Sequence, residues 1–390
     1  MPSFWRALFI LAYTKYSFIM KPFLFTLCLF LHAMLIAQDS DLFVTGSRSL
    51  LGLEKNLSAS IALGDIDQDG DLDIVVANGR HWTQQNFYFV NAGQGRFSVM
   101  KPLGADRSTS YAAELGDLNG DGWLDIAVGN DMAPNILFMN DGKGAFIQVG
   151  TFGHPKRPTR NLILYDIDVD GDLDILITNR GAENEICLND GSGNFGEIIA
   201  FGSQDDSTID VTLADIDQDG APDLILANRD KQQNYIYFND DLSFTRRIPF
   251  GTGEDETRAV GVSDLNMDGY LDIVTANIGA PNQIYFGDEA FSFSKHIALG
   301  ADEKTFSMDI ADLNNDGSPD LVFGNYGSPN FVYLNESNGQ IFQAVMLSDN
   351  TFNTYDIICG DLNGDKYVDV IEANSDDYNL YYLNRIGNQD

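Results

Sequence analysis

Thiols, imidazoles and basic side chains are scarce in this chain. Its 390 residues include 3 cysteines and 4 histidines, and 23 lysines and arginines stand against 58 aspartates and glutamates, for a formal net charge of -35. Nucleic acid and anionic membrane surfaces carry negative charge themselves, so we expect neither as a partner. The hydrophobic share of 44% and the aromatic share of 12% are nevertheless enough for a folded core.

The shortage of nucleophiles and bases argues against common catalytic sites. Beyond the N-terminal segment, the only histidines are His81, His154 and His296, and no serine or cysteine nucleophile signature is present. Cys187 and Cys359 are far apart in the sequence, and we expect both to be buried as small apolar side chains without a disulfide. We therefore expect no enzymatic activity.

The first 37 residues lack an uncharged run long enough for a comfortable transmembrane helix. From Met20 they have a positive start, an apolar stretch over 23–36 and a small residue at Ala37, which is the pattern of an export signal. We expect Met20 to be the true initiator and residues 1–37 to be a cleaved signal peptide, although an uncleaved anchor is the alternative. Residues 38–390 would then be secreted, periplasmic or on the cell surface, with no integral membrane span.

Aspartate at a regular spacing is what the sequence has in abundance. The stretch GDIDQDGDLDIVVAN (64–78) is followed by six similar copies. The first aspartates of the seven copies are separated by 52, 49, 49, 49, 48 and 49 residues. They are Asp65, Asp117, Asp166, Asp215, Asp264, Asp312 and Asp361. A serine or threonine stands seven residues before each one and an asparagine thirteen residues after it, so the chain is an array of seven repeats.

Each repeat has the pattern of four short strands. In the second repeat we expect them near 111–115, 125–129, 136–139 and 145–150, with turn-forming residues between them. No helical periodicity is present. Four strands per repeat of roughly 40–50 residues are typical of propeller blades. The sequence therefore predicts an all-β fold, a seven-bladed β-propeller of four-stranded blades over residues 38–390.

The last repeat lacks its outermost strand. Six repeats end in an aromatic strand, but the seventh stops at YLNRIGNQD, where that strand should begin. A suitable segment, DLFVTGS around Phe43, stands at the other end of the array. We expect this N-terminal strand to complete the last blade and close the ring, which would leave no free sheet edge.

The acidic segment of each repeat, D-x-[DN]-x-D-G-x-x-D, offers side-chain oxygens at positions 1, 3, 5 and 9 and a backbone carbonyl at position 7. This oxygen-only set, with glycine at position 6 for the turn, is close to the first nine positions of an EF-hand loop. Zinc and copper prefer histidine or cysteine, and magnesium takes fewer protein ligands, so we predict up to seven Ca²⁺ ions. The predicted ligands are Asp65, Asp67, Asp69, Asp71, Asp73, Asp117, Asn119, Asp121, Trp123, Asp125, Asp166, Asp168, Asp170, Asp172, Asp174, Asp215, Asp217, Asp219, Ala221, Asp223, Asp264, Asn266, Asp268, Tyr270, Asp272, Asp312, Asn314, Asp316, Ser318, Asp320, Asp361, Asn363, Asp365, Tyr367 and Asp369.

The loops differ in charge, so we expect them to differ in affinity. The first, third and fourth carry aspartate at position 3 and should bind calcium most tightly, whereas the other four carry asparagine there. The loop at 361–369 also has Lys366 in place of the position-6 glycine. A lysine is unfavourable at positive φ and adds a positive charge, so this site should be the weakest.

On these residues the chain resembles FG-GAP/VCBS-type repeat proteins and is similar to the propeller of integrin α-subunits. Besides the acidic loops, NIGAPN (277–282), NYGSPN (325–330) and NDMAPN (130–135) resemble the Gly-Ala-Pro element of that family. The resemblance implies a seven-bladed propeller with calcium in the hairpin between the first two strands of a blade. It also implies binding, adhesion or scaffolding outside the cell, and it specifies the fold far better than the ligand.

Strand parity places the loops between the second and third strands on the face opposite the acidic loops. That face carries RHWTQQ (80–85) and HPKRPTR (154–160). An exposed tryptophan commonly stacks on a sugar ring or fills a pocket of a partner. We therefore predict that a monomer binds an extracellular glycan or protein through this face. The candidate residues are Trp82, Arg80, His81, His154, Lys156, Arg157 and Arg160.

The alternative is a polysaccharide lyase that acts on uronate-containing glycans. His154 or Tyr165 could serve as its base, and Arg157 or Arg160 could neutralise the carboxylate of the substrate. Carboxylates that face the channel of the propeller are a further set of candidates. They are Glu114, Asp210, Asp309 and Asp356.

Overall fold

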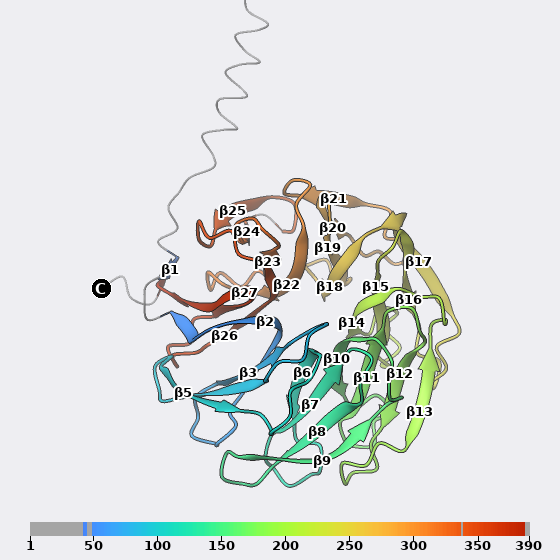
Figure 1. Cartoon of the computed structure of the whole chain (residues 1–390). Coiled ribbons are helices and arrows are strands. Elements are labelled where there is room, and N and C mark those ends of the chain that lie inside the picture. The colour runs from blue at the N-terminus through green and yellow to red at the C-terminus, as the bar shows by residue number, and fades with distance from the viewer. Residues whose placement is uncertain (1–41, 45–48, 337, 387–390) are drawn as a thin grey trace, which may run out of the picture.

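The computed structural model describes residues 42–44, 49–336 and 338–386, and the predicted signal peptide lies outside them. Over this part the chain is all-β, and its sheets are arranged in a ring, as in a β-propeller (Figure 1). No helix among the described residues is long and apolar enough to cross a membrane. Cys187 is buried, as predicted, whereas Cys359 is half-buried and not fully buried as expected; both are free cysteines.

Five sheets have four antiparallel strands that run in chain order from the centre of the ring to its rim (Figure 1). In the second repeat the strands begin and end within about two residues of the predicted bounds, because turn residues and apolar runs mark them clearly. The strands are β6 (Ser110–Gly116), β7 (Asp125–Asn130), β8 (Asn135–Asn140), β9 (Phe146–Phe152), β10 (Thr159–Tyr165), β11 (Asp174–Asn179), β12 (Asn184–Leu188), β13 (Glu197–Phe201), β14 (Thr208–Ala214), β15 (Asp223–Asn228), β16 (Gln232–Tyr237), β17 (Arg247–Asp255), β18 (Thr257–Ser263), β19 (Asp272–Asn277), β20 (Asn282–Tyr285), β21 (His296–Leu299), β22 (Thr305–Ala311), β23 (Asp320–Asn325), β24 (Phe331–Asn335) and β25 (Phe342–Met346).

The sixth sheet has seven strands and contains both the first and the last repeat. Its strands are β1 (Phe43–Val44), β2 (Leu50–Gly64), β3 (Asp73–Asn78), β4 (Phe87–Asn91), β5 (Phe97–Pro102), β26 (Thr354–Gly360) and β27 (Asp369–Asn384). The prediction of seven blades is therefore wrong. The described propeller has six sheets, of which five are four-stranded blades and one is a composite blade.

Continuous hydrogen bonding between the ends of the chain causes this fusion. β27 is a single strand of 16 residues that pairs with β26, β2 and β1. β2 is 15 residues long; its first part pairs with β27 through Leu50, Leu51, Asn56 and Leu57, and residues 58–64 pair with β3. The N-terminal strand does pair with the C-terminal one, with Phe43 opposite Asn384. The ring is thus closed, but by a shared sheet.

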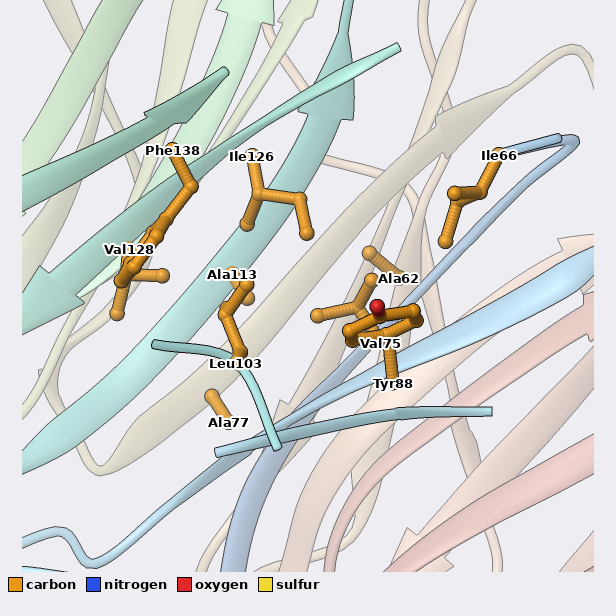
Figure 2. Close-up of a cluster of buried hydrophobic side chains, with 10 residues drawn as sticks. All are labelled: Ala62, Ile66, Val75, Ala77, Tyr88, Leu103, Ala113, Ile126, Val128 and Phe138. Atoms are coloured by element: carbon orange, nitrogen blue, oxygen red, sulfur yellow. The ribbon is translucent and has the colours of Figure 1, made fainter. Parts of the chain in front are cut away.

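The second strand of each repeat carries most of the core. β3, β7, β11, β15, β19 and β23 are buried at every position, because each lies in a sheet with a neighbouring sheet on both sides. Figure 2 shows one such interface, in which Val75 and Tyr88 lie in one cluster with Ile126 and Phe138 of the next sheet. Full burial of a large apolar side chain stabilises the fold by roughly 1.5–3 kcal/mol. These interfaces hold the sheets rigidly and so position the loops at both faces.

Candidate metal loops and binding face

The seven acidic loops share one backbone conformation. In each, the position-1 carboxylate accepts the backbone N–H groups of positions 5 and 6, as Asp117 does from Asp121 (3.1 Å) and Gly122 (2.8 Å). The position-6 residue always has a positive φ, between 73° and 103°. Lys366 adopts this conformation at 73° and donates its N–H to Asp361 at 2.8 Å. The last loop therefore has the same conformation as the others, although it lacks the glycine.

Position 4 is left-handed as well, which the sequence did not reveal. Its φ lies between 56° and 74° in all seven loops, but only two of them have glycine there. Val169 occupies this position in the third loop with a φ of 63° and is 79% exposed. A β-branched residue is a genuine outlier in this region, and an exposed side chain has little packing to compensate. The third loop thus contains a local strain.

Replacing Val169 with asparagine should stabilise the protein by about 1 kcal/mol, because asparagine tolerates the left-handed region. Asn315 already occupies the equivalent position of the sixth loop with a φ of 56°. The measurement is the free energy of unfolding in urea with calcium chelated. Val149, which is 54% exposed on β9 and is not left-handed, provides the control variant Val149→Asn. Equal stabilisation by both variants would contradict the strain argument.

The position-9 aspartates are buried, with an exposed fraction of at most 1%. One oxygen accepts the N–H of position 2 and the other accepts the N–H of the residue near the end of the third strand. In the second repeat Leu118 (3.1 Å) and Asn140 (2.8 Å) donate to Asp125, and the same pair of bonds occurs in all seven repeats. Burial raises the pKa of Asp125 to about 6, although the two N–H bonds act in the opposite direction. Position 9 is thus a structural residue in addition to a predicted ligand.

Three loops bring carboxylate oxygens close enough to hold a metal ion. In each, the oxygens of positions 1, 3 and 9 lie within 4.8 Å of one another. The clusters are Asp65, Asp67 and Asp73; Asp166, Asp168 and Asp174; and Asp215, Asp217 and Asp223. They are the three loops that carry aspartate at position 3.

Two oxygens in these clusters have no other partner. Asp67 Oδ1 and Asp217 Oδ1 are buried and accept no hydrogen bond from any described residue. Burial and the neighbouring carboxylates of Asp69 and Asp65 raise the pKa of Asp67. A buried carboxylate oxygen without a partner is unfavourable, and a hard cation would supply the missing contact. The residues therefore fit a metal ion.

The other predicted ligands are engaged differently. The position-5 carboxylate accepts the N–H of position 7 in every loop, at 3.0 Å for Asp69. In the sixth loop Asn314 donates its side-chain amide to Asp316 at 3.0 Å. In the fourth loop Arg246 forms an ion pair with Asp217 at 2.8 Å. A guanidinium at this carboxylate would compete with a bound cation, which the sequence spacing alone did not show.

In five repeats an asparagine at the end of the third strand ties an acidic loop to its neighbour. Its side-chain amide donates to the position-2 carbonyl of the adjacent loop in five repeats. The pairs are Asn91 with Leu362 (2.8 Å), Asn140 with Ile66 (3.0 Å), Asn189 with Leu118 (2.9 Å), Asn335 with Leu265 (2.9 Å) and Asn384 with Leu313 (2.7 Å). Because neighbouring loops share these bonds, ordering one loop by a metal ion would also stabilise an interface between sheets.

The recurrent serines, threonines and asparagines form a second set of bonds on the opposite face. Ser110 Oγ donates to Asn130 Oδ1 at 2.9 Å and accepts the side-chain amide of Asn86 from the preceding repeat at 2.8 Å. The same bond joins the ends of the array, where Asn379 donates to Ser58 at 3.1 Å. These residues repeat in the sequence because they hold neighbouring sheets together.

Several of the predicted binding residues gather around Asp131. His81 Nδ1 lies 2.9 Å from one oxygen of Asp131, and Arg160 donates to the other at 2.8 Å. The second ring nitrogen of His81 lies 2.9 Å from the hydroxyl of Tyr111. Trp82, on the same loop as His81, is 73% exposed. The structure therefore brings His81 and Arg160 together and leaves Trp82 open to a ligand.

The remaining predicted binding residues surround a buried carboxylate that sequence reasoning missed. His154 Nδ1 lies 2.8 Å from Glu185, whose side chain is 2% exposed, and Arg157 Nε lies 3.4 Å from the same oxygen. Arg157 also faces Glu183 at 3.7 Å, while Lys156 is exposed. Five of the other six repeats have an aliphatic or aromatic residue where Glu185 stands, and this contrast could have revealed it.

A β-bulge turns one residue of each repeat toward the centre of the ring. The register between the first two strands shifts directly after the recurrent serine or threonine in all seven repeats, and such a bulge re-aims the extra residue. These residues line one cavity of about 180 Å³ on the face opposite the acidic loops, and we call them the mouth ring. They are Ala59, Tyr111, Arg160, Ile209, Arg258, Phe306 and Tyr355.

Arg80 lies beside the mouth ring, with its guanidinium carbon 4.0 Å from the ring centroid of Tyr355. Of the mouth ring and this neighbour, the sequence prediction included Arg80 and Arg160 alone. A bulge leaves no mark in the hydrophobic pattern, so the other members were missed. The signal that could have found them is their place directly after the recurrent serine or threonine.

The sequence matches a family model described as FG-GAP-like repeat six times, over residues 65–128, 117–177, 166–226, 215–275, 264–323 and 312–372. Each match begins at a position-1 aspartate of an acidic loop. No curated protein has a sequence that matches the chain.

Among solved structures, the fold is similar to that of BBS1N, crystallised in complex with ARL6DN and soaked with lead (TM-score 0.60, 11% identity, 88% of this chain and 96% of that chain). It is also similar to the WD40 domain of coronin from Toxoplasma gondii (TM-score 0.59, 10% identity, 88% of this chain and 84% of that chain). At such low identity the likeness shows the fold alone. Because the repeat matches span residues 65–372, the chain belongs to the FG-GAP-like repeat family.

Proposed function

We propose that this protein is an exported, monomeric binding module that is stabilised by calcium and has no catalytic activity. Its ligand, a glycan or a protein outside the cell, would bind the face opposite the acidic loops. The observation that carries the proposal is the convergence of carboxylate oxygens in the acidic loops, where Asp67 Oδ1 and Asp217 Oδ1 are buried without a partner among the described residues.

Calcium suits these loops better than other ions. All offered ligands are oxygens, which excludes a preference for zinc or copper, and the repeated carboxylates give more protein ligands than magnesium usually takes. Asp at position 3 favours the first, third and fourth loops, but the ion pair of Arg246 with Asp217 weakens the fourth. We therefore propose that the first and third loops bind calcium most tightly and that the seventh loop, which contains Lys366, binds it most weakly.

Trp82 supports binding at the opposite face. Its side chain is 73% exposed, on the loop that also carries Arg80 and His81. Exposure of a large aromatic side chain is unfavourable in water and is common at sites that stack on sugars or enter a partner's pocket. The lyase alternative has less support, since His154 and Arg157 both contact the buried carboxylate of Glu185.

We expect Trp82→Ala to lower the affinity for a bound polysaccharide or protein by about tenfold or more, because an aromatic anchor commonly contributes over 1 kcal/mol. The test titrates the protein, in calcium, against neutral and acidic polysaccharides while recording ultraviolet absorbance. Ile147→Ala, which removes an apolar side chain 59% exposed on β9, is the matched control and should not alter binding. An increase in absorbance from unsaturated sugar ends would contradict the binding module and show that the protein is a lyase.

A further inference from the structure

The mouth ring is unusual in a chain with a net charge of -35, because Arg258 in the ring and Arg80 beside it form no ion pair with a described carboxylate. Arg258 makes no hydrogen bond or ion pair with any described residue, and its guanidinium carbon lies 5.5 Å from the ring centroid of Phe306. Arg80 has a buried Nε without a hydrogen-bond partner in the described part of the chain. Elsewhere on this face Arg180 is paired with Asp230 at 2.7 Å. Arg160 of the mouth ring is also paired, with Asp131 at 2.8 Å, so within the ring the unpaired arginine is Arg258.

A buried guanidinium without an anion is unfavourable. Burial lowers the pKa of Arg258, which shows that its charge is held in a poorly solvated place. The charge of Asp210 offsets this desolvation only in part. Because an arginine keeps its proton in proteins, an anion that bonds directly to the guanidinium would stabilise it further. The aromatic rings of Phe306 and Tyr355 attract the cations, but a ring face cannot accept several N–H bonds. The unused donors are therefore available to a molecule from outside the chain.

The carboxylates deeper in the cavity are already satisfied by the inner strands. Asp210 accepts the N–H of Val260 at 3.0 Å, and Asp356 accepts the N–H of Ile61 at 2.8 Å and the hydroxyl of Ser307 at 2.7 Å. These bonds join neighbouring strands, so both aspartates act in the fold. The charge of Arg258 acts to lower the pKa of both carboxyls, so they attract the guanidinium, although neither forms a hydrogen bond with it.

Glu114 differs from these aspartates, because no hydrogen bond to its carboxyl is formed by the described residues. Burial and the charges of Asp356 and Asp210 raise the pKa of Glu114 to about 8. Its carboxyl is therefore largely protonated at neutral pH and can donate a hydrogen bond. The cavity thus combines the guanidinium groups of Arg258 and Arg160, an acid O–H and the aromatic side chains of Tyr111 and Tyr355. The amide of Asn161 also lines it but donates to Asp210.

We propose that the mouth ring binds the carboxylate of a uronic-acid unit at the end of a polysaccharide chain. Arg258 holds the carboxylate, and the aromatic side chains pack against the sugar ring. Arg160 adds its positive charge while it keeps its ion pair with Asp131. Ala59 and Ile209 leave the space that the ring of the sugar fills. A cavity of about 180 Å³ suits one sugar unit and is small for a larger ligand. This inference rests on the proposed function and names the ligand class at that face.

The test is calorimetric titration of the whole, calcium-loaded protein with galacturonate and glucuronate, compared with galactose and glucose. We expect at least one uronate to bind about tenfold or more tightly than its neutral counterpart, because a charge-assisted bond forms only with the carboxylate. Arg258→Met should lower uronate affinity by about tenfold or more. Arg180→Gln, which removes an arginine already paired with Asp230, should leave it unchanged.

A second variant keeps the test valid if Arg258→Met fails to fold. Ala59→Phe fills the cavity without a change of charge, and the equivalent bulges of other repeats already hold Phe306 and Tyr355. It should abolish uronate binding with a wild-type melting temperature. Equal affinity for uronate and neutral sugar, or unchanged affinity in the variant that folds, would overturn the proposal. Tighter binding of a glutamate-rich peptide than of an oligouronate would overturn the sugar assignment.

The mouth-ring site and the proposed binding function can be told apart by their effects on binding. If wild-type protein and Arg258→Met bind a polysaccharide equally well, the mouth-ring site is wrong and the proposed binding function stands. If the wild-type protein binds neither polysaccharides nor uronates, the glycan ligand falls together with the mouth-ring site, and a protein ligand remains.

Discussion

Removing calcium should lower the melting temperature of this protein by about 10 °C or more. A site with a dissociation constant of about 10⁻⁴–10⁻³ M gains roughly 0.6–1.8 kcal/mol in about 2 mM calcium, and up to seven loops add their contributions. For a domain of this size, each kcal/mol shifts the melting temperature by about 2 °C. The measurement is thermal unfolding with calcium and with a chelator. An unchanged melting temperature would refute calcium binding.

Two comparisons sharpen this experiment. Asp67→Asn should reduce the response to calcium, because it removes the charge of a carboxylate whose Oδ1 is buried and unpartnered among the described residues, while its stability in chelator should stay near that of the wild type. Asp205→Asn, an exposed aspartate on the opposite face, is the matched control and should respond to calcium as the wild type does. Magnesium at the same concentration should restore less stability than calcium, because octahedral geometry fits this loop poorly. If calcium stabilises both variants equally, Asp67 does not take part in binding the ion.

Asp125→Ala should destabilise the protein by about 3 kcal/mol or more, with calcium or without it. The substitution leaves the buried N–H groups of Leu118 and Asn140 without an acceptor, and each such group costs about 1–3 kcal/mol. The second loop is the right place for this test, because asparagine stands at its position 3 and its carboxylates form no three-membered cluster in the described chain. The free energy of unfolding in urea, measured in chelator, gives the structural part of the loss.

Asp121→Ala, in the same loop, separates the two roles of the acidic residues. Asp121 is exposed and accepts the N–H of Trp123 at 2.9 Å, so its loss in chelator should cost no more than about 1 kcal/mol. With calcium present, this variant should also lose part of the stabilisation by the metal. If Asp125→Ala costs no more than Asp121→Ala in chelator, position 9 has no structural role.

Element boundaries and the class of fold could be read from the sequence, because the information is local and repeated. Glycine-rich turns and apolar runs mark each strand, and in the second repeat the predicted strand near 125–129 is β7 (Asp125–Asn130). Comparison of the seven copies shows which positions are shared, so an irregular residue in one copy does not obscure the strand. The number of blades could not be read in this way, since Leu50 and Leu51 pair with the far end of the chain. Which strands pair at the two ends of the described chain depends on how the ring closes in three dimensions, and the local sequence does not specify this.

In the acidic loops, too, the sequence predicted some features and only the structure showed others. Spacing alone located the carboxylates, and the aspartate at position 3 marked the loops in which they converge. It did not show that the position-9 aspartates also hold two backbone N–H groups, nor that Arg246 reaches Asp217 from another hairpin. Those contacts depend on the third strand and its hairpin, which lie tens of residues away in the sequence.

By itself the sequence determined the repeat, its four strands, the oxygen-rich loops and the family, because each of these is specified within about 49 residues and then copied. Only the tertiary structure decided the composite blade, the second role of position 9 and the mouth ring. Arg258, Tyr111 and Tyr355 come from three repeats and meet because seven bulges point to one axis. Ring closure brings together residues that are far apart in the sequence and that no local pattern relates. The set of side chains at the centre of the propeller is therefore determined by the tertiary structure.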